Sequence, residues 1–400
     1  MKTLFQINVT ANWGSTGKIA EGIGQIAISH GWRSLIAYGR GNPKSESELI
    51  RIGNDWDMRL HALSSRIFDN QGLMSKRATK KLDEQIKAIH PDIIHLHNIH
   101  GYYLNYKILF EYLATAGIPI VWTLHDCWSF TGHCAHFVTV DCNKWMLQCD
   151  NCALKKDYPQ SLVLDRSKQN YIDKKNAFNS VQNLTFVPVS NWIDSYLKQS
   201  FLKNYHSIVI HNGIDTDVFY PKDDIDSNKF TVLGVANVWN QSKGLNDFIE
   251  LAKKIDKDIQ LILVGVSARQ KESLPDNIIA IERTSNADEL AKLYSSANVY
   301  VNLTYADTFP TTNIEALACG TPVITYRTGG SPEAISEDTG FVVEQGDLEG
   351  VIDAINEIKA KGKNYYQTKC RERAVKYFRK EDRYNDYIKL YEDILNDKIK

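Results

Sequence analysis

The chain has 400 residues, with 47 Lys and Arg residues against 48 Asp and Glu residues, and its formal net charge at pH 7 is −1. A domain typically has about 100–200 residues, so this length predicts two large domains or three smaller ones. With 43% hydrophobic and 24% charged residues, the composition is that of an ordinary globular protein and excludes wholesale disorder or a fibrous repeat. A net charge near zero gives no long-range attraction for polyanions, so binding to nucleic acid is not expected.

The N-terminal apolar run is short. Gln6 and Asn8 interrupt residues 3–9, so this run is interpreted as a buried strand and not as a secretion signal. No stretch approaches the roughly 18 consecutive apolar residues of a membrane-spanning helix. We therefore expect a cytoplasmic protein, and contact with the inner face of the cell membrane stays open.

Apolar runs with strand character alternate with helical patterns along the whole chain. This alternation predicts parallel α/β layers in two doubly wound domains. The expected strands are residues 3–9, 34–39, 92–98, 118–126, 184–190 and 207–215 in the first half, and 230–238, 259–265, 277–282, 299–303, 322–326 and 340–344 in the second.

A polar stretch with Pro221 and five Asp residues between positions 215 and 226 separates the two halves. The domains predicted from it are an N-terminal domain of residues 1–212, a linker of residues 213–228 and a C-terminal domain of residues 229–384. Residues 385–400 continue a helical pattern. That helix either crosses back to the first domain or covers the second.

The most informative segment contains two acidic residues eight positions apart, Asp307 and Glu315. Pro310 precedes a helical pattern whose first turn would present free backbone N–H groups at the carboxyl end of a parallel strand. Such a helix start binds anions. Glu315, expected in the first helical turn, suits the vicinal hydroxyls of a ribose, and Asp307 suits a sugar hydroxyl. The alternative is that both acids simply complement the helix N-terminus.

Neighbouring loops favour the ligand-binding interpretation. Lys243 follows a predicted strand and can neutralise a diphosphate, while Gly244 lets the backbone approach closely. The TGG loop of residues 328–330 follows another strand. These loops would lie at the same sheet edge as the acidic segment.

Residues 307–324 fit the pattern D-x-F-P-x(4)-E-A-x-A-C-G-x-P-V-I and resemble the retaining glycosyltransferases of family 4, which have the GT-B fold. The segments HLHNIHGYYLN (95–105) and TLHDCWSFTGHCAHF (123–137) are similar to the bacterial branch that builds colanic acid, capsule and O-antigen polysaccharides. The resemblance covers nearly the whole chain. It implies two Rossmann-like domains facing each other across a cleft.

The resemblance also implies a donor site. It places Asp307 on the donor hexose, Glu315 on the nucleotide ribose and Lys243 on the diphosphate. The family's usual phosphate-binding Arg, a few residues before the Lys, is absent here, and Arg327 or Arg40 are the remaining candidates for its role. The residues expected to bind the donor are Gly14, Gly17, Asn237, Lys243, Asp307, Phe309, Pro310, Thr311, Thr312 and Glu315.

The loop with Gly14 and Gly17 follows the first predicted strand. It can bring backbone N–H groups up to a phosphate or to the acceptor. It lacks the third glycine of a dinucleotide-binding motif, so an ordinary turn is the alternative.

Histidines end two of the predicted strands. His125, with Asp126 beside it, matches the family's His at the donor sugar, and we expect His125, Asp307 and Lys243 to be the catalytic residues. His95 and His97 lie on one face of their strand because successive side chains alternate. The resemblance gives an acceptor-side role to His97, Asn98, Tyr102 and Tyr103. A buried polar network is the alternative.

Metal-dependent catalysis is not expected, because the Asp-x-Asp pairs of the sequence lie in turns and polar loops. Cysteines crowd between positions 127 and 152. The spacing Cys134-x7-Cys142-x6-Cys149-x2-Cys152 predicts a structural zinc site that shapes an acceptor-side loop. Reduced cysteines without a metal are the alternative.

The segment of residues 74–90 carries five basic residues at near-helical spacing, Lys76, Arg77, Lys80, Lys81 and Lys87. Basic helices of similar enzymes touch anionic membranes. A solvated helix face is the alternative.

The resemblance to family 4 implies a retaining transferase. It would move a hexose from a nucleotide-diphosphate sugar, with a UDP-sugar slightly favoured, to a saccharide or lipid-linked saccharide acceptor in surface polysaccharide biosynthesis. The alternatives are a GT-B-like sugar-nucleotide epimerase and a non-catalytic sugar-binding protein.

Overall fold

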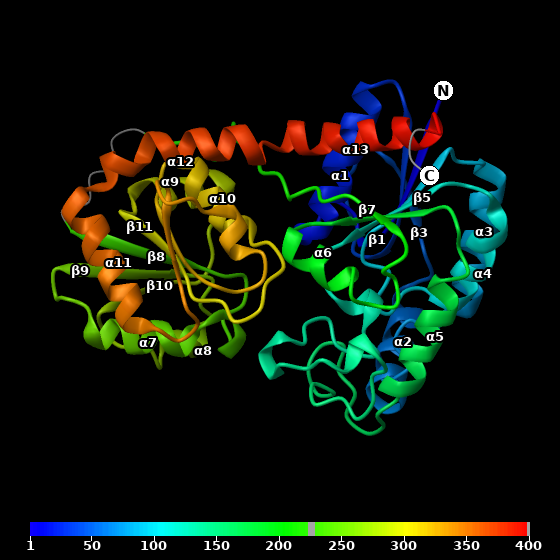
Figure 1. The fold of residues 1–400 in the computed structure, drawn as a ribbon, viewed down its shortest axis with the longest axis horizontal. Coiled ribbons are helices and arrows are strands. Elements are labelled where there is room, and N and C mark those ends of the chain that lie inside the picture. Colours follow the sequence, from blue (N-terminus) through cyan, green and yellow to red (C-terminus); the bar gives the residue numbers. More distant parts are fainter. Residues whose placement is uncertain (223–228, 398–400) are drawn as a thin grey trace. The chain divides into compact units, whose positions relative to one another are not determined.

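The structure, a computed structural model, describes residues 1–222 and 229–397. The chain divides into two compact units, the first formed by Met1–His211 and Arg383–Lys400 and the second by Asn212–Asp382 (Figure 1). Residues 213–222 of the expected linker belong to the second unit, and residues 223–228 lie outside the described part of the chain.

The first unit contains a seven-stranded sheet in the order β3-β2-β1-β4-β5-β6-β7, and every strand pair is parallel. Its strands are β1 (Thr3–Thr10), β2 (Arg33–Arg40), β3 (Glu48–Arg51), β4 (Ile93–Leu96), β5 (Ile120–Leu124), β6 (Leu184–Pro188) and β7 (His206–Ser207). Its helices are α1 (Gly14–Ser29), α2 (Asp55–Phe68), α3 (Lys76–Ile89), α4 (Tyr106–Ala116), α5 (Ser167–Phe178) and α6 (Asn191–Leu197).

The second unit contains a six-stranded parallel sheet in the order β10-β9-β8-β11-β12-β13. Its strands are β8 (Phe230–Val235), β9 (Ile259–Val264), β10 (Ile278–Ile281), β11 (Val299–Asn302), β12 (Val323–Tyr326) and β13 (Gly340–Val343). Its helices are α7 (Leu245–Lys254), α8 (Ala268–Lys271), α9 (Ala287–Ser296), α10 (Thr311–Ala318), α11 (Leu348–Lys361) and α12 (Lys363–Phe378).

Both units are therefore Rossmann-like α/β domains, as the alternating pattern predicted. In each sheet the strand order reverses beside the first strand of the unit, between β1 and β4 and between β8 and β11. Ligands of such sheets bind beyond the carboxyl ends of the strands at this reversal. The loops that leave β1, β4, β8 and β11 are thus the places to look for a site.

Three element boundaries differ from the predictions. The expected strand of residues 207–215 is reduced to the short strand β7, although the N–H groups of Ile208 and Ile210 still donate to the carbonyl oxygens of Phe186 and Pro188 at 3.1 and 3.2 Å. Strand β3 was not predicted, and its residues are only half-buried or exposed. Helix α1 begins at Gly14, about one turn earlier than expected.

The last helix, α13 (Lys380–Leu395), buries aromatic side chains in the first unit. Tyr384, Tyr387 and Tyr391 pack in a core cluster with apolar residues of β1, α1 and β5. Gly22 on α1 is needed for this packing, because a Cβ atom there would lie 2.2 Å from the ring of Tyr384. None of the helices in the described part of the chain is long and apolar enough to span a bilayer.

The contact between α1 and α13 yields a stability prediction. Gly22→Ala should lower the free energy of unfolding by about 1–3 kcal/mol, because the added methyl group overpacks the site. In a Tyr384→Ala background the same change should cost much less, since the clashing ring is gone. Denaturant unfolding measures both, and Lys18→Ala, an exposed change on the same helix, is the control. Equal costs in the two backgrounds would contradict the packing.

Candidate functional site

In the second unit, a lysine and a carboxylate meet at the carboxyl edge of the sheet. The Nζ atom of Lys243, after β8, lies 2.7 Å from Oδ2 of Asp307, in the loop after β11. Both side chains are partly exposed, by 34% and 22%. The two residues that the sequence predicted for the diphosphate and the sugar are therefore adjacent, beside the strand reversal.

Two glycines allow the loops to meet. At Gly244 (φ +75°), a Cβ atom would lie 2.1 Å from the carbonyl oxygen of Leu303, and at Gly329 (φ +54°) one would lie 1.7 Å from the carbonyl oxygen of Asp307. Only glycine combines this left-handed backbone with such a close approach. The loops that carry Lys243, Asp307 and the TGG sequence are thus fixed by backbone packing.

Helix α10 starts beside this pair. Its N-cap is Pro310, and in the described part of the chain no side chain caps the helix start. The N–H of Asn313 bonds the carbonyl oxygen of Pro310 at 3.3 Å, so the first-turn N–H groups offered to an anion are those of Thr311 and Thr312. Phe309 is buried against Phe378, with ring centroids 5.7 Å apart, and so anchors the loop before the helix.

The position of Glu315 corrects the sequence prediction. It is the fifth residue of α10 and lies beyond the first helical turn, which contains no acid. Because helical side chains tilt towards the N-terminus, it still leans towards the helix start. Tyr294 Oη donates a hydrogen bond of 3.1 Å to Glu315 Oε2.

A cavity of about 910 Å³ lies in the same unit, beyond the ends of β8, β9 and β10. Asn237 lines it, as do Arg269 and Arg283, which sequence reasoning missed. Trp239 also lines it and donates a hydrogen bond from Nε1 to the carbonyl oxygen of Val264 (2.8 Å). The chain therefore offers two guanidinium groups here, although the arginine usual before Lys243 is absent.

In the first unit, hydrogen bonds connect the buried side chains of Gln6 and His97 with the half-buried His125. Gln6 Nε2 donates to the carbonyl oxygen of Ala20 (2.8 Å), which turns Gln6 Oε1 towards His97 Nε2 at 3.1 Å. His97 Nδ1 lies 3.2 Å from His125 Nε2. Because Oε1 only accepts, the network assigns the proton of His97 to Nε2 and that of His125 to Nε2 as well. His125 Nδ1 is then an acceptor.

Burial lowers the pKa of His97 well below its usual value, and the neighbouring histidines lower it further. Burial also lowers the pKa of His125 to about 4, although the charge of Asp126 acts in the opposite direction. His95 and His97 share a face, as predicted, with ring centroids 4.0 Å apart. His95 bonds Thr123 and Tyr391, so it belongs to the core network.

A second group of side chains lies beside this one. His100 Nε2 is 2.8 Å from Asp126 Oδ2, and His100 Nδ1 is 2.9 Å from Tyr158 Oη. Burial alone would raise the pKa of Asp126, but the neighbouring His100 lowers it to about 2. The sequence places His100 in a cluster with His95, His97 and Asn98, but it gave no signal for Tyr158, which lies 58 positions further along the chain.

The remaining residues predicted in the first unit lie in the loop after β4 and at the start of α1. The hydroxyl of Tyr103, which is buried, donates a hydrogen bond to the backbone carbonyl oxygen of Asn98 (2.8 Å). Tyr102 adopts φ +69° and is half-buried. Gly14 begins α1, and Gly17 packs so closely on Thr10 that a Cβ atom would lie 2.6 Å from its hydroxyl oxygen.

The expected zinc site is not supported. Within residues 1–222 and 229–397, no group of three or more His, Cys, Asp or Glu side chains is arranged to hold a metal ion. Cys134 hydrogen-bonds Cys152. Cys149 accepts the Gly132 N–H at 3.1 Å, and Cys142 packs at the edge of the apolar core.

The cysteine-rich segment of residues 127–152 is held in place by aromatic packing and by a buried lysine. Phe137 stacks on Trp145 with ring centroids 5.0 Å apart, and both rings contact Tyr196. Lys174 Nζ donates to the carbonyl oxygens of Trp128 (2.7 Å) and Thr131 (3.0 Å), and burial lowers its pKa to about 7.

The chain thus has two Rossmann-like units, and the second carries a lysine, carboxylates and an uncapped helix start at its strand reversal, an arrangement that suits a phosphate-bearing ligand. Residues 29–218 match the family described as Glycosyltransferase Family 4, and residues 216–381 match the family described as Glycosyl transferases group 1. The chain therefore belongs to the family 4, group 1 glycosyltransferases.

Sequence and structural similarity to individual proteins is consistent with this family. The chain is 23% identical over 369 residues to the Escherichia coli (strain K12) protein named "Putative colanic acid biosynthesis glycosyl transferase WcaC", covering 86% of this chain and 87% of that protein. Among solved structures, sucrose-phosphate synthase from Thermosynechococcus elongatus has a TM-score of 0.72 at 20% identity, covering 99% and 100% of the two chains. Anabaena Alr3699/HepE in complex with UDP-glucose has a TM-score of 0.67 at 14% identity, covering 98% and 100%. These likenesses identify the fold as GT-B.

The neutral histidines give a pH prediction. The pKa of His125 is about 4 in the folded chain and about 6.5 when unfolded, so between these values the unfolded state binds more protons. The free energy of unfolding should therefore fall as pH drops from about 6.5 towards 4, by up to about 3 kcal/mol for this residue.

Denaturant unfolding across this pH range measures the effect. His125→Gln should flatten the profile, whereas the exposed change His206→Gln is the matched control. An unchanged slope in His125→Gln would show that this imidazole is not held neutral by the fold.

Proposed function

We propose that this protein transfers a hexose, with retention of configuration, from a nucleotide-diphosphate sugar to a saccharide acceptor in surface polysaccharide biosynthesis. The observation that carries the proposal is the Lys243–Asp307 pair beside the uncapped start of α10. The similarity to WcaC supports polysaccharide biosynthesis, and the HepE complex with UDP-glucose supports a UDP-sugar as donor.

The donor's diphosphate leaves with developing negative charge. The first-turn N–H groups of α10 are fixed dipoles that stabilise this leaving group, and Lys243 adds a positive charge once it exchanges Asp307 for the diphosphate. Asp307, released from Lys243, then accepts a hydrogen bond from a hydroxyl group of the hexose. Arg269 and Arg283 are our candidates for the second phosphate cation, in place of Arg327, which pairs with Glu344 at 2.6 Å on the surface.

In this proposal the first unit supplies His125, which acts at the donor sugar, and the acceptor-side groups. His125 presents an Nδ1 acceptor, fixed by the hydrogen bonds from Gln6 through His97, and suits a sugar hydroxyl. His97, Asn98, Tyr102 and Tyr103 shape the surroundings. Attack on the same face from which the diphosphate leaves retains the configuration and needs no nucleophilic carboxylate. We propose that the acceptor is lipid-linked.

A thermal-shift panel tests the donor assignment. UDP-, GDP- and ADP-sugars are added to the full chain, each with and without EDTA. We expect a UDP-sugar to raise the melting temperature most, and EDTA to leave the shift unchanged because the phosphate ligands are protein groups. If no nucleotide sugar stabilises the protein, the donor assignment is wrong.

The ribose role of Glu315 has its own test. Glu315→Gln should weaken UDP binding by about 10–100-fold, because a hydrogen bond to a charged group contributes about 1.5–3 kcal/mol. Calorimetry measures the affinity, and Glu349→Gln on the exposed face of α11 is the control. Equal UDP affinity in Glu315→Gln and wild type would exclude the ribose contact.

A further inference from the structure

The hydrogen bonds around His100 form a chain of groups that the proposed mechanism does not use. Asp126 Oδ1 accepts the N–H of Trp128 at 2.9 Å, and Asp126 Oδ2 lies 2.8 Å from His100 Nε2. On the other side of the imidazole ring, His100 Nδ1 lies 2.9 Å from Tyr158 Oη. The chain therefore runs from a carboxylate through an imidazole to a phenol.

This order of groups defines where the protons lie. A carboxylate only accepts hydrogen bonds, so neutral His100 carries its proton on Nε2 and offers Nδ1 as an acceptor. The hydroxyl group of Tyr158 therefore donates to His100 Nδ1. The phenol oxygen keeps the capacity to accept a hydrogen bond from a further hydroxyl group.

The exposure of the three side chains changes along the chain of hydrogen bonds. The side chains of His100 and Asp126 are 6% and 14% exposed, whereas Tyr158 is 48% exposed. The phenol is thus the end that a ligand can reach, while its two partners are sheltered from water. Burial at the hydroxyl end of the side chain raises the pKa of Tyr158, so this residue is a neutral phenol at pH 7.

Segments far apart in the sequence bring these groups to the carboxyl edge of the first sheet. His100 follows β4, which borders the strand reversal, and Asp126 follows β5. Tyr158 comes from the loop that follows the cysteine-rich segment, and its ring centroid lies 6.3 Å from that of Tyr102. Aromatic rings that flank a few polar groups suit a saccharide, which has both apolar C–H faces and hydroxyl groups.

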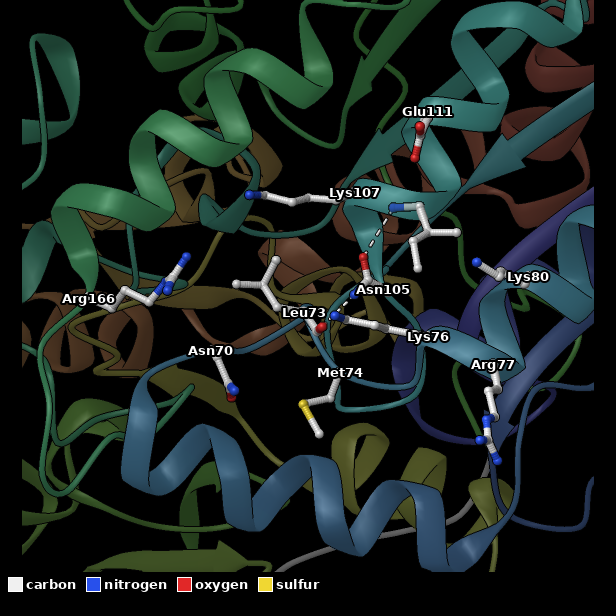
Figure 2. A pocket seen from close by; sticks show the side chains of 11 residues that line it. Asn70, Leu73, Met74, Lys76, Arg77, Lys80, Asn105, Lys107, Glu111 and Arg166 are labelled. Atoms are coloured by element: carbon white, nitrogen blue, oxygen red, sulfur yellow. Dashed lines mark hydrogen bonds between the residues drawn. The ribbon is translucent and has the colours of Figure 1, made fainter.

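The loop that carries His100 is fixed by its packing. At Gly101 (φ +119°), a Cβ atom would lie 2.6 Å from a side-chain atom of Val9, so a larger residue does not fit. Further along this loop, Asn105 caps α4 and donates a hydrogen bond from Nδ2 to the carbonyl oxygen of Leu73 (Figure 2). The imidazole of His100 is thus presented from a well-anchored segment.

His100 differs from the histidines beside it in its ability to take up a proton. Burial lowers the pKa values of His95 and His97 well below the usual range and that of His125 to about 4, so all three are neutral near pH 7. His100 instead has the carboxylate of Asp126 at 2.8 Å. An opposite charge at this distance stabilises an imidazolium ion.

We propose that Tyr158 is a catalytic residue that receives the hydroxyl group of the acceptor, and that His100 and Asp126 position Tyr158 and take over its proton. This inference deepens the proposed transfer reaction and rests on it. Below, these three residues are named the proton relay.

The proton relay acts while the glycosidic bond forms. As the acceptor oxygen bonds to C1 of the hexose, the bond between C1 and the diphosphate oxygen breaks, and the diphosphate leaves with the electron pair. The proton of the acceptor hydroxyl group passes to Tyr158 Oη, and the proton of the phenol passes to His100 Nδ1. The imidazolium ion is paired with Asp126, and after product release it returns the proton through Tyr158 to water.

Hydrolysis of UDP-sugars tests the proton relay, because water takes the place of the acceptor when no acceptor sugar is present. Release of UDP from UDP-glucose, UDP-galactose and UDP-N-acetylglucosamine is measured with the full chain. Tyr158→Phe keeps the ring and removes the hydroxyl group, so it should lower kcat by about 100-fold, a typical contribution of general acid–base catalysis. The KM for the UDP-sugar and the affinity for UDP should not change. Tyr112→Phe on α4 lies outside the relay and is the matched control.

A second variant, His100→Gln, tests whether His100 acts through Tyr158. Glutamine does not take up a proton, so kcat should again fall by about 100-fold at an unchanged KM. The double variant with Tyr158→Phe should be no slower than either single variant, because residues that act as a unit are not additive. His206→Gln, an exposed change in the same unit, is the control.

The outcomes separate the proton relay from the proposed function. Equal kcat in Tyr158→Phe and wild type overturns the relay, and so do losses that multiply in the double variant. Both results leave the proposed function intact, because UDP release by wild type is still observed. Wild type that releases UDP from none of the three sugars contradicts the proposed function, and the relay fails with it.

Discussion

The ion pair between Lys243 and Asp307 is the interaction on which the proposed site depends. A cation that is to receive a diphosphate must be held in place without becoming permanently neutralised. A partly exposed pair at 2.7 Å meets both needs, because such pairs contribute little net free energy and can exchange partners. The glycines at 244 and 329 fix the two loops through backbone contacts, so the pair's geometry does not rely on the pair itself.

The first unit has the same architecture, but its buried polar residues fix the protonation state of a histidine, His125. A histidine that accepts a hydrogen bond from a sugar hydroxyl must be neutral and must carry its proton on a defined nitrogen. Burial keeps His125 neutral, and the hydrogen bonds that begin at Gln6 assign its proton through His97. The strand order of a Rossmann-like sheet places both residues where β4 and β5 end. Each unit therefore has its polar side chains at the carboxyl edge of a parallel sheet.

Sequence periodicity was sufficient for most of the strands, the two-domain architecture and the common face of His95 and His97, because each depends on local alternation, but it missed β3 and overestimated the length of β7. It could not reveal Arg269 and Arg283, since their approach to one cavity depends on how two loops fold. The exact start of α10 is also set in three dimensions, so Glu315 was placed one turn too early. The cysteine spacing suggested zinc, but among the described residues no group of three or more His, Cys, Asp or Glu side chains is arranged to hold a metal ion.

The central claim is that the donor's diphosphate replaces Asp307 as the partner of Lys243. Calorimetric titration of UDP, which carries the diphosphate but no hexose, into wild type, Lys243→Ala and Asp307→Asn tests this most directly. We predict that Lys243→Ala weakens UDP binding by about 10–100-fold, the loss of a charged hydrogen bond, and that Asp307→Asn binds UDP at least as tightly as wild type because a competing anion is removed. Equal UDP affinity in wild type and Lys243→Ala, or a large loss in Asp307→Asn, would contradict the account.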